Sequence, residues 1–218
     1  MTSRIPVSVL GATGVVGQRF VARLARHPWF ELAELGASER SVGRRYSEAC
    51  TWRVPGCEPY AGFADRPVVA CTPDACRTTV VFSALDAGPA RELEPLFARA
   101  GATVFSNASA FRMEADVPLV VPEVNPGHVE LLAQQRRLRG WSGAIVCNPN
   151  CTTAVLVTAL APLHQRFGLE QILMTSMQAV SGAGYPGAAA LDVLGNVVPY
   201  IANEELKVEE ETRKLLGV

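Results

Sequence analysis

Three glycines stand between an apolar run and a helical pattern, and this arrangement constrains the fold more than any other feature. Gly11, Gly14 and Gly17 follow the apolar run of residues 5–10, and residues 15–27 then carry apolar side chains at helical spacing. A strand, a glycine turn and a helix in this order present backbone N–H groups at the positive end of a helix, where a pyrophosphate can bind. The pattern predicts a dinucleotide site, although a tight turn without a ligand uses the same residue types.

The first 147 residues alternate between strand-like and helix-like segments. Further helices are expected at residues 89–100 and 125–139, and strands at residues 30–37, 68–71, 80–84, 102–106, 118–121 and 142–147. Such alternation predicts a parallel sheet with helices on both faces. We therefore expect an α/β fold, with a Rossmann-like doubly wound sheet as the nucleotide-binding domain in residues 1–147.

Residues 148–218 read as the beginning of a second domain. A long helix is expected at residues 151–166 and a strand of period-two character at 169–180. A loop rich in Gly, Ala and Pro with a short helix follows at 181–199, and an amphipathic helix at 203–216 closes the chain.

Composition excludes several classes of protein. Hydrophobic residues make up 49% of the chain and charged residues 19%, which indicates a packed globular protein. The net charge is −1, without a basic stripe for nucleic acid, and no segment approaches the ~20 apolar residues of a membrane span. No leader pattern precedes the first strand, so we expect a cytoplasmic protein that binds neither nucleic acid nor membranes.

The cysteines do not form a metal-binding pattern. Their spacings contain no paired CxxC motif, and the histidines lie far from them in sequence, so neither a zinc site nor any other metal site is expected. In a reducing compartment a disulfide framework is not expected either. The six are Cys50, Cys57, Cys71, Cys76, Cys147 and Cys151.

Cys151 stands at the predicted start of a helix, after Asn148, Pro149 and Asn150. Either asparagine could cap this helix, whose N-terminus favours a thiolate and could stabilise an oxyanion. A buried structural cysteine is the alternative, but the polar residues before Cys151 argue against it. Cys147 ends an apolar strand and is expected to be inert. A dinucleotide beside a thiolate suits reduction of an activated acyl group through a thioester.

The end of the second strand favours NADP over NAD. NAD-binding folds usually place an acidic residue there to bind the ribose hydroxyls. The segment Gly36–Ser41 instead offers Ser38, Arg40 and Ser41, which suit a 2′-phosphate, although Glu39 keeps NAD open.

Several ordered motifs carry a resemblance to a known family. The sequence resembles aspartate-semialdehyde dehydrogenase, in the branch found in archaea and fungi. The malonyl-CoA reductases of some archaea resemble the same branch, so an acyl-CoA substrate is the enzymatic alternative. The matching pieces are Gly11–Gly17, Gly36–Ser41, Ser106–Ser109, Pro122–Pro126, Asn148–Thr153 and Met177–Pro186.

The resemblance implies a reaction and a set of roles. Cys151 would displace phosphate from β-aspartyl phosphate, and NADPH would reduce the thioester to aspartate semialdehyde, for lysine, threonine and methionine biosynthesis. Gln178 would orient the substrate, and Glu204 would bind its ammonium group. Arg112 with Asn107, and separately Lys207, would bind phosphate; for Arg112 and Lys207 a solvated surface position is the alternative. The residues expected at the cofactor are Gly11, Thr13, Gly14, Val15, Val16, Gly17, Ser38, Arg40, Ser41, Ser83, Ser181 and Gly182.

The resemblance also implies groups beyond the last helix: a histidine base, an arginine for the substrate carboxylate and further strands. His27, His128 and His164 are poor replacements, since His164 lies 13 residues after Cys151, or ~20 Å along a helix. Relative to the family the chain reads as C-terminally truncated, so residues 148–218 would be an incomplete α+β domain for catalysis or dimerisation, and the chain alone is expected to lack the base. It could be a fragment, a natural nucleotide-binding or regulatory short form, or one half of a split enzyme. The family implies a homodimer or tetramer.

Overall fold

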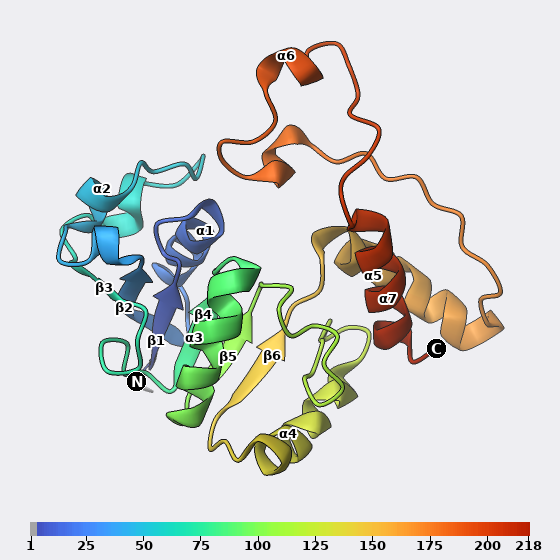
Figure 1. The fold of residues 1–218 in the computed structure, drawn as a ribbon, viewed down its shortest axis with the longest axis horizontal. Helices are drawn as coiled ribbons and strands as arrows, with labels where there is room; N and C mark the ends of the chain where they lie inside the picture. The colour runs from blue at the N-terminus through green and yellow to red at the C-terminus, as the bar shows by residue number, and fades with distance from the viewer. Residues whose placement is uncertain (1–3) are drawn as a thin grey trace. The chain divides into compact units, whose positions relative to one another are not determined.

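The computed structural model describes residues 4–218, which form two compact units (Figure 1). The first unit holds the described residues up to Val120 together with Gly127–Asn148. The second holds Val121–Pro126 and Pro149–Val218. The assignment of residues 1–147 and 148–218 to separate functional domains remains a proposal.

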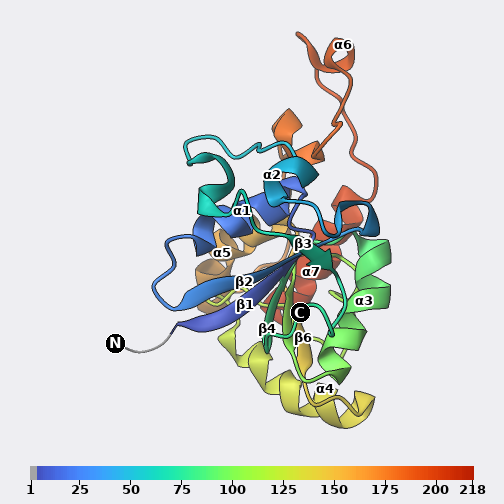
Figure 2. The ribbon, with the colours of Figure 1, turned by 90° about the vertical axis from the view of Figure 1, so that its left-hand side faces the viewer.

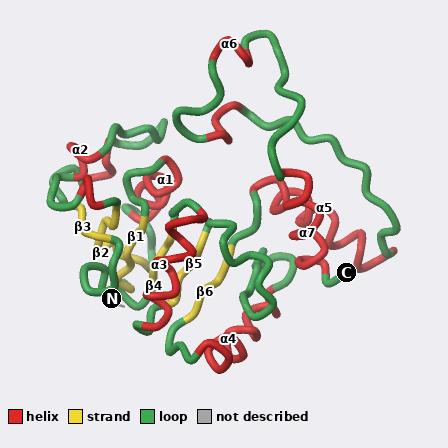
Figure 3. The backbone as a smooth tube through the Cα atoms, in the orientation of Figure 1, coloured by secondary structure: helices red, strands yellow, loops and turns green. Residues whose placement is uncertain are grey.

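The first unit is built on one parallel sheet with the strand order β3-β2-β1-β4-β5-β6 (Figures 1 and 3). The order reverses at β1, so the chain builds outward in both directions, as in a doubly wound fold. The expected Rossmann-like fold class is confirmed. The strands are β1 Ile5–Leu10, β2 Phe30–Ala37, β3 Val68–Ala70, β4 Val80–Ser83, β5 Thr103–Ser106 and β6 Ala144–Cys147.

Helices cover both faces of this sheet. Figure 2 shows α1 on one side of the strands and α3 on the other. These helices are α1 Val15–Leu24 and α3 Ala87–Arg99, and α4 Leu131–Arg139 packs on β6. Shorter pieces complete the unit: α2 Tyr46–Ala49 and the 3-10 turns η1 Glu39–Ser41, η2 Pro59–Gly62 and η3 Pro126–Glu130, whose first residue belongs to the second unit.

The core forms because the central strands bury side chains on both faces. Val7, Val9 and Leu10 of β1 are fully buried, and Leu32 and Leu35 of β2 are nearly so. The central sheet is therefore a rigid base for the loops that leave its carboxyl edge.

The carboxyl ends of five strands lie in register, at the last residue of four of them and at the penultimate residue of β2. Gly36 pairs with Leu10, Leu10 with Ser83, Ser83 with Ser106, and Ser106 with Cys147. Because the strands are parallel, the loops after these five residues all leave the same edge of the sheet, where ligands bind in such folds.

The second unit pairs two helices, α5 Cys151–Phe167 and α7 Glu204–Leu216. The chain between them is almost entirely loop in Figure 3, interrupted by η4 Val180–Ala183 and α6 Ala190–Val193. Val157 and Ala161 of α5, and Val208 and Leu215 of α7, are buried.

Two expected strands differ from the structure. Residues 118–121 form only an isolated bridge between Leu119 and Cys147, since the chain turns at once and the Asn125 side chain accepts a hydrogen bond from the Val121 N–H. Residues 169–180 form no strand and are almost wholly exposed. This segment has a period-two pattern, but no strand within the described residues lies beside it to pair with it. A strand is stable only when it is paired.

Candidate active site

The glycine loop has a conformation that only glycine tolerates at its first and last positions. Gly11 has a φ of +73°, and a Cβ there would lie 2.6 Å from the Ala84 carbonyl oxygen. A Cβ on Gly17 would lie 2.1 Å from the Gly11 carbonyl oxygen. The first turn of α1 is therefore held against the end of β1 without side chains between them.

This loop fits the pyrophosphate of a dinucleotide. Gly14 is the N-cap of α1, and no side chain caps the helix. The first N–H groups of a helix lack partners within it, so they can bind an anion that approaches along the helix axis. Thr13, Val15 and Val16 supply the rest of this turn, so the predicted phosphate-binding residues lie in one continuous turn, in which Gly17 is buried.

Two residues that the sequence did not single out hold the loop in place. The Gln18 side-chain amide is buried; it donates to the Thr13 and Thr51 carbonyl oxygens and accepts from the Arg53 N–H. The Tyr46 hydroxyl donates to the Ala12 carbonyl oxygen at 2.7 Å, and burial raises the pKa of Tyr46 above its usual value. Tyr46 stands between Arg45 and Ser47, and Gln18 between Gly17 and Arg19, so their neighbours in sequence gave no signal of these contacts.

The segment after β2 is fixed to the glycine loop by the hydrogen bond from the Ala12 N–H to the Gly36 carbonyl oxygen. Ser38 and Arg40 are exposed beyond this point, where a 2′-phosphate could reach them. Ser41 is buried instead, so its predicted cofactor contact has less support.

Asn107 and Arg112 lie at the same edge, after β5. The Arg112 guanidinium donates to the Asn107 carbonyl oxygen at 2.7 Å, and the Asn148 amide donates to the Asn107 side-chain oxygen at 2.6 Å. Arg112 is only 8% exposed, so the alternative of a solvated surface arginine is wrong. Ser83 is fully buried at the end of β4, and its carbonyl oxygen accepts from the Asn107 N–H.

A buried acid stabilises the turn that carries Asn107. Glu94 of α3 is fully buried, and Ser106 donates to its carboxyl group at 2.6 Å. The Ser106 hydroxyl also accepts from the Ala108 N–H. Burial raises the pKa of Glu94, and hydrogen bonds from Ser106 and Ser83 oppose this only in part. Sequence reasoning missed Glu94, although it lies on the apolar side of its helix with Ala90 and Phe97.

In the second unit, Cys151 is the first residue of α5 and is exposed. Asn150 caps the helix, because its side-chain oxygen accepts from the Thr152 and Thr153 N–H groups at 2.8 and 3.3 Å. The predicted cap is thus confirmed for Asn150. Exposure rules out the alternative of a buried structural cysteine at Cys151, whereas Cys147 is fully buried.

Glu204 lies at the centre of a polar cluster beside this helix start. Its carboxylate accepts from the Gln178 amide at 2.7 Å, from the Asn150 amide at 3.0 Å and from the Thr152 hydroxyl at 3.2 Å. Partial burial works against the charged form, but these hydrogen bonds and the charge of Lys207 hold the pKa of Glu204 below its usual value. The structure therefore brings together Gln178, Glu204 and the residues on both sides of Cys151.

Ser181 and Gly182 lie in η4 and are exposed, and a Cβ on Gly182 would stand 3.6 Å from the Gln178 side-chain oxygen. Since α5 is continuous from Cys151 to Phe167, His164 stays at the far end of that helix from Cys151. Among residues 4–218, no three side chains of the kinds that bind metals are grouped together.

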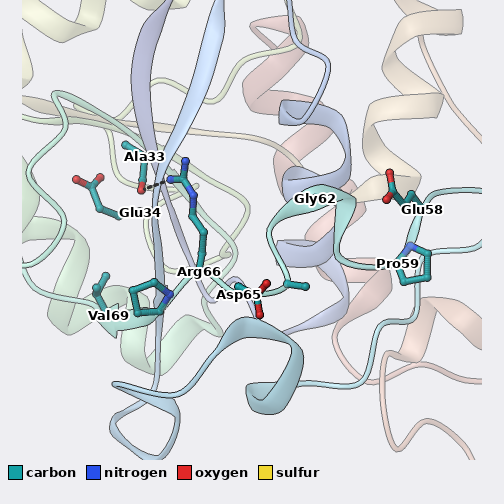
Figure 4. A pocket seen from close by; sticks show the side chains of 10 residues that line it. Ala33, Glu34, Glu58, Pro59, Gly62, Asp65, Arg66 and Val69 are labelled. Atoms are coloured by element: carbon teal, nitrogen blue, oxygen red, sulfur yellow. Dashed lines mark hydrogen bonds between the residues drawn. The ribbon is translucent and has the colours of Figure 1, made fainter.

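A hollow elsewhere in the first unit contains none of the predicted site residues (Figure 4). It lies beside β2 and encloses about 590 Å³, between Glu34, Glu58, Asp65 and Arg66. Figure 4 shows Arg66 bonded to the Ala33 carbonyl oxygen, and it also donates to Leu32. Because Arg66 already binds backbone carbonyls and Asp65 pairs with Arg45, we assign this hollow no ligand.

A Rossmann sheet with a glycine loop, joined to a helix that begins with an exposed cysteine, defines a nucleotide-binding protein of the dehydrogenase class. Comparison with known families agrees. The family description "Semialdehyde dehydrogenase, NAD binding domain" matches residues 6–132, and "Semialdehyde dehydrogenase, dimerisation domain" matches residues 160–218. The chain belongs to the semialdehyde dehydrogenase family.

Individual relatives carry a more specific name. The chain is 54% identical over 214 residues to aspartate-semialdehyde dehydrogenase of Archaeoglobus fulgidus, covering 98% of this chain and 62% of the relative. It is 47% identical to the enzyme of that name from Cryptococcus neoformans, covering 98% of this chain and 60% of the relative. The resemblance to the archaeal and fungal branch is confirmed, and nothing in these relatives supports the acyl-CoA reductase alternative.

Solved structures of proteins with this name also resemble the chain. A crystal structure of aspartate semialdehyde dehydrogenase with NADP from Candida albicans matches with a TM-score of 0.84 and 42% identity, covering 98% of this chain and 60% of that chain. Aspartate semialdehyde dehydrogenase II from Vibrio cholerae matches with a TM-score of 0.71 and 27% identity, covering 99% of this chain and 67% of that chain. The chain thus spans about three fifths of the length of the curated relatives named above.

Proposed function

We propose that this chain binds NADP and supplies the nucleophile of an aspartate-semialdehyde dehydrogenase. The reaction is the NADPH-dependent reductive dephosphorylation of β-aspartyl phosphate to aspartate semialdehyde. One observation carries the proposal: Cys151 is exposed at the first turn of α5, next to a cluster in which Glu204 joins Gln178, Asn150 and Thr152.

In the first step the Cys151 thiolate attacks the acyl carbon of β-aspartyl phosphate. The carbon–sulfur bond forms, the bond from carbon to the phosphate oxygen breaks, and phosphate leaves with that electron pair. Because Asn150 caps the Thr152 and Thr153 N–H groups, the Cys151 N–H at the start of α5 would stabilise the negative oxygen of the tetrahedral intermediate. Bound NADPH supplies the hydride that reduces the resulting thioester.

The other predicted residues have binding roles in this proposal. Glu204 binds the substrate ammonium, and Gln178 orients the acyl group next to the thiol. Lys207 binds phosphate, as does Arg112 with Asn107. The hydrogen bonds of Glu204 support its role, because they keep the carboxylate ionised and therefore able to attract a cation.

The cofactor is bound by the glycine loop, and the side chains after β2 select NADP. Exposed Ser38 and Arg40 support this choice, since a guanidinium pairs with a 2′-phosphate. Ser83, Ser181 and Gly182 are proposed to approach the nicotinamide half.

The protein is proposed to act in the cytoplasm as a homodimer or tetramer. The match of residues 160–218 to a dimerisation domain supports the oligomer. Within residues 4–218, none of the helices has the length and apolar character needed to cross a membrane.

The test measures NADP-dependent oxidation of aspartate semialdehyde in phosphate buffer, with Cys151→Ala as the control. Turnover that the substitution abolishes would support the full proposal. NADP binding without turnover would favour a nucleotide-binding or regulatory role, or a need for a second polypeptide. Mass spectrometry after mixing with β-aspartyl phosphate separates these cases, since an acyl adduct on Cys151 shows the nucleophile without requiring a base.

A further inference from the structure

Glu211 is a buried acid on α7 whose position the proposed function does not explain. It is only 2% exposed, and its carboxylate accepts a hydrogen bond from the Asn150 N–H at 2.6 Å. The two residues are 61 positions apart in sequence. A buried charged group is costly unless it is hydrogen-bonded, so this contact accounts for part of what keeps Glu211 inside.

Asn150 is bound to α7 through its side chain as well as through its backbone. The side-chain amide donates to Glu204, which precedes Glu211 by seven residues, or about two helical turns. Glu204 and Glu211 therefore lie on nearly the same side of α7 and hold one residue of the other helix at two points.

Asn150 in turn determines how α5 begins. Its side-chain oxygen caps the Thr152 and Thr153 N–H groups, and Cys151 is the residue between the cap and these amides. The thiol thus stands next to a capping residue whose backbone N–H binds the Glu211 carboxylate and whose side chain binds Glu204.

We propose that Glu211 is a positioning residue for Cys151, acting through the Asn150 backbone. The inference rests on the proposed role of Cys151 as the nucleophile. A helix N-terminus favours a thiolate only while its first turn is formed. Without an acceptor for the Asn150 N–H, the cap loosens and the first turn of α5 opens more often.

Two substitutions at one position separate the hydrogen bond from the charge. Glu211→Gln and Glu211→Leu both remove the negative charge, but only glutamine keeps an oxygen that can accept from Asn150. Leu215→Ala is the matched packing control, because Leu215 is buried on α7 and its loss loosens α7 without removing the acceptor.

The main readout is alkylation of the 218-residue chain by iodoacetamide at one pH, quantified at each cysteine by mass spectrometry. Cys57 is exposed and belongs to the other unit, so it is the internal reference. We expect Cys151 to react about threefold or more slowly in Glu211→Leu than in Glu211→Gln, with equal rates at Cys57. Leu215→Ala should leave the ratio of the alkylation rates of Cys151 and Cys57 at the wild-type value.

Hydrogen exchange gives a second readout. The Thr152 and Thr153 amides should exchange about tenfold faster in Glu211→Leu than in Glu211→Gln. Equal alkylation of Cys151 in these two variants, or an equal effect of Leu215→Ala, would overturn the inference. Should Glu211→Leu fail to fold, the unaltered chain still decides, since a rapidly exchanging Asn150 amide contradicts the proposal. Neither readout needs cofactor or substrate, so a failed activity assay leaves this test intact.

Discussion

Two acids in this chain are buried on the apolar sides of their helices, Glu94 on α3 and Glu211 on α7. Each binds a group close to a proposed site residue: Glu94 through Ser106 to the turn of Asn107, and Glu211 to the residue before Cys151. A buried carboxyl group is costly, but once its hydrogen bonds are formed it makes the surrounding structure rigid. Such rigidity suits residues that position a reacting group.

Glu94 makes the stability of the first unit depend on pH. Burial raises its pKa above the ordinary 4.5, so the folded state holds this proton more tightly than the unfolded state does. The stabilising contribution is complete below pH 4.5 and is lost as the pH rises through the raised pKa. In urea unfolding from pH 4.5 to 8, wild type should lose stability relative to Glu94→Gln as the pH rises. Parallel curves for the two proteins would show that the raised pKa is absent.

Gly17 offers a sharp test of the glycine loop. A Cβ at this position would lie 2.1 Å from the Gly11 carbonyl oxygen and 2.7 Å from Ala12 Cα, both backbone atoms that cannot move aside cheaply. Gly17→Ala should lower the free energy of unfolding by about 3 kcal/mol and abolish NADP binding. Gly88→Ala is the control, since a Cβ there meets nothing within 4 Å and alanine favours the helix. A stable, NADP-binding Gly17→Ala protein would contradict the loop geometry.

The sequence identified the residues with local signatures and missed those with distant partners. The glycines and the Asn150 cap follow from neighbours within a few positions. Gln18, Glu94 and Glu211 bind groups 33, 12 and 61 residues away, and no local pattern specifies such contacts. One clue was available: Glu94 and Glu211 each interrupt an apolar stripe, between Ala90 and Phe97 and between Val208 and Leu215.

At the level of elements, the strands of the first unit were predictable because most of them are apolar runs between turns. β1 and β2 begin and end where the sequence pattern does, and α5 and α7 differ from it by one residue each. The expected strand at 169–180 was wrong. Its alternating pattern suits a strand, but no second strand among the described residues pairs with it. Strand pairing is non-local, so alternation alone could not decide it.

The chain between α5 and α7 should therefore be the first part of the protein to be cut by a protease. Leu173 and Met177 are each 89% exposed, and Leu191 is 88% exposed. Without strand partners, this backbone opens at little energetic cost. Thermolysin should cut within residues 169–202 at least about tenfold faster than within the sheet, as mass spectrometry of the early fragments would show. First cuts within β1–β6 would refute this prediction.

At the scale of the whole molecule, the two units should respond differently to cofactor. NADP is proposed to bind through the glycine loop, so its binding energy should stabilise the first unit most. At 100 times its dissociation constant, a ligand adds about 2.7 kcal/mol to the free energy of unfolding. Calorimetry should show this gain with NADP and a smaller one with NAD at equal concentration. Arg40→Ala should remove most of the difference, and equal gains from both nucleotides in wild type would exclude Arg40 as the selecting residue.

The hydrogen bonds of Glu204 also bear on how a substrate is admitted. Its Oε1 atom already accepts from Gln178, Asn150 and Thr152, so an ammonium group that binds this carboxylate as proposed would compete with these donors. Displacement would free one of the two hydrogen bonds of the Gln178 amide, whose other acceptor is the Thr152 hydroxyl, when the acyl group arrives beside the thiol. Binding of the substrate ammonium group and release of Gln178 from Glu204 would then occur in one exchange of hydrogen-bond partners. A substrate without an ammonium group would leave Gln178 bound to Glu204.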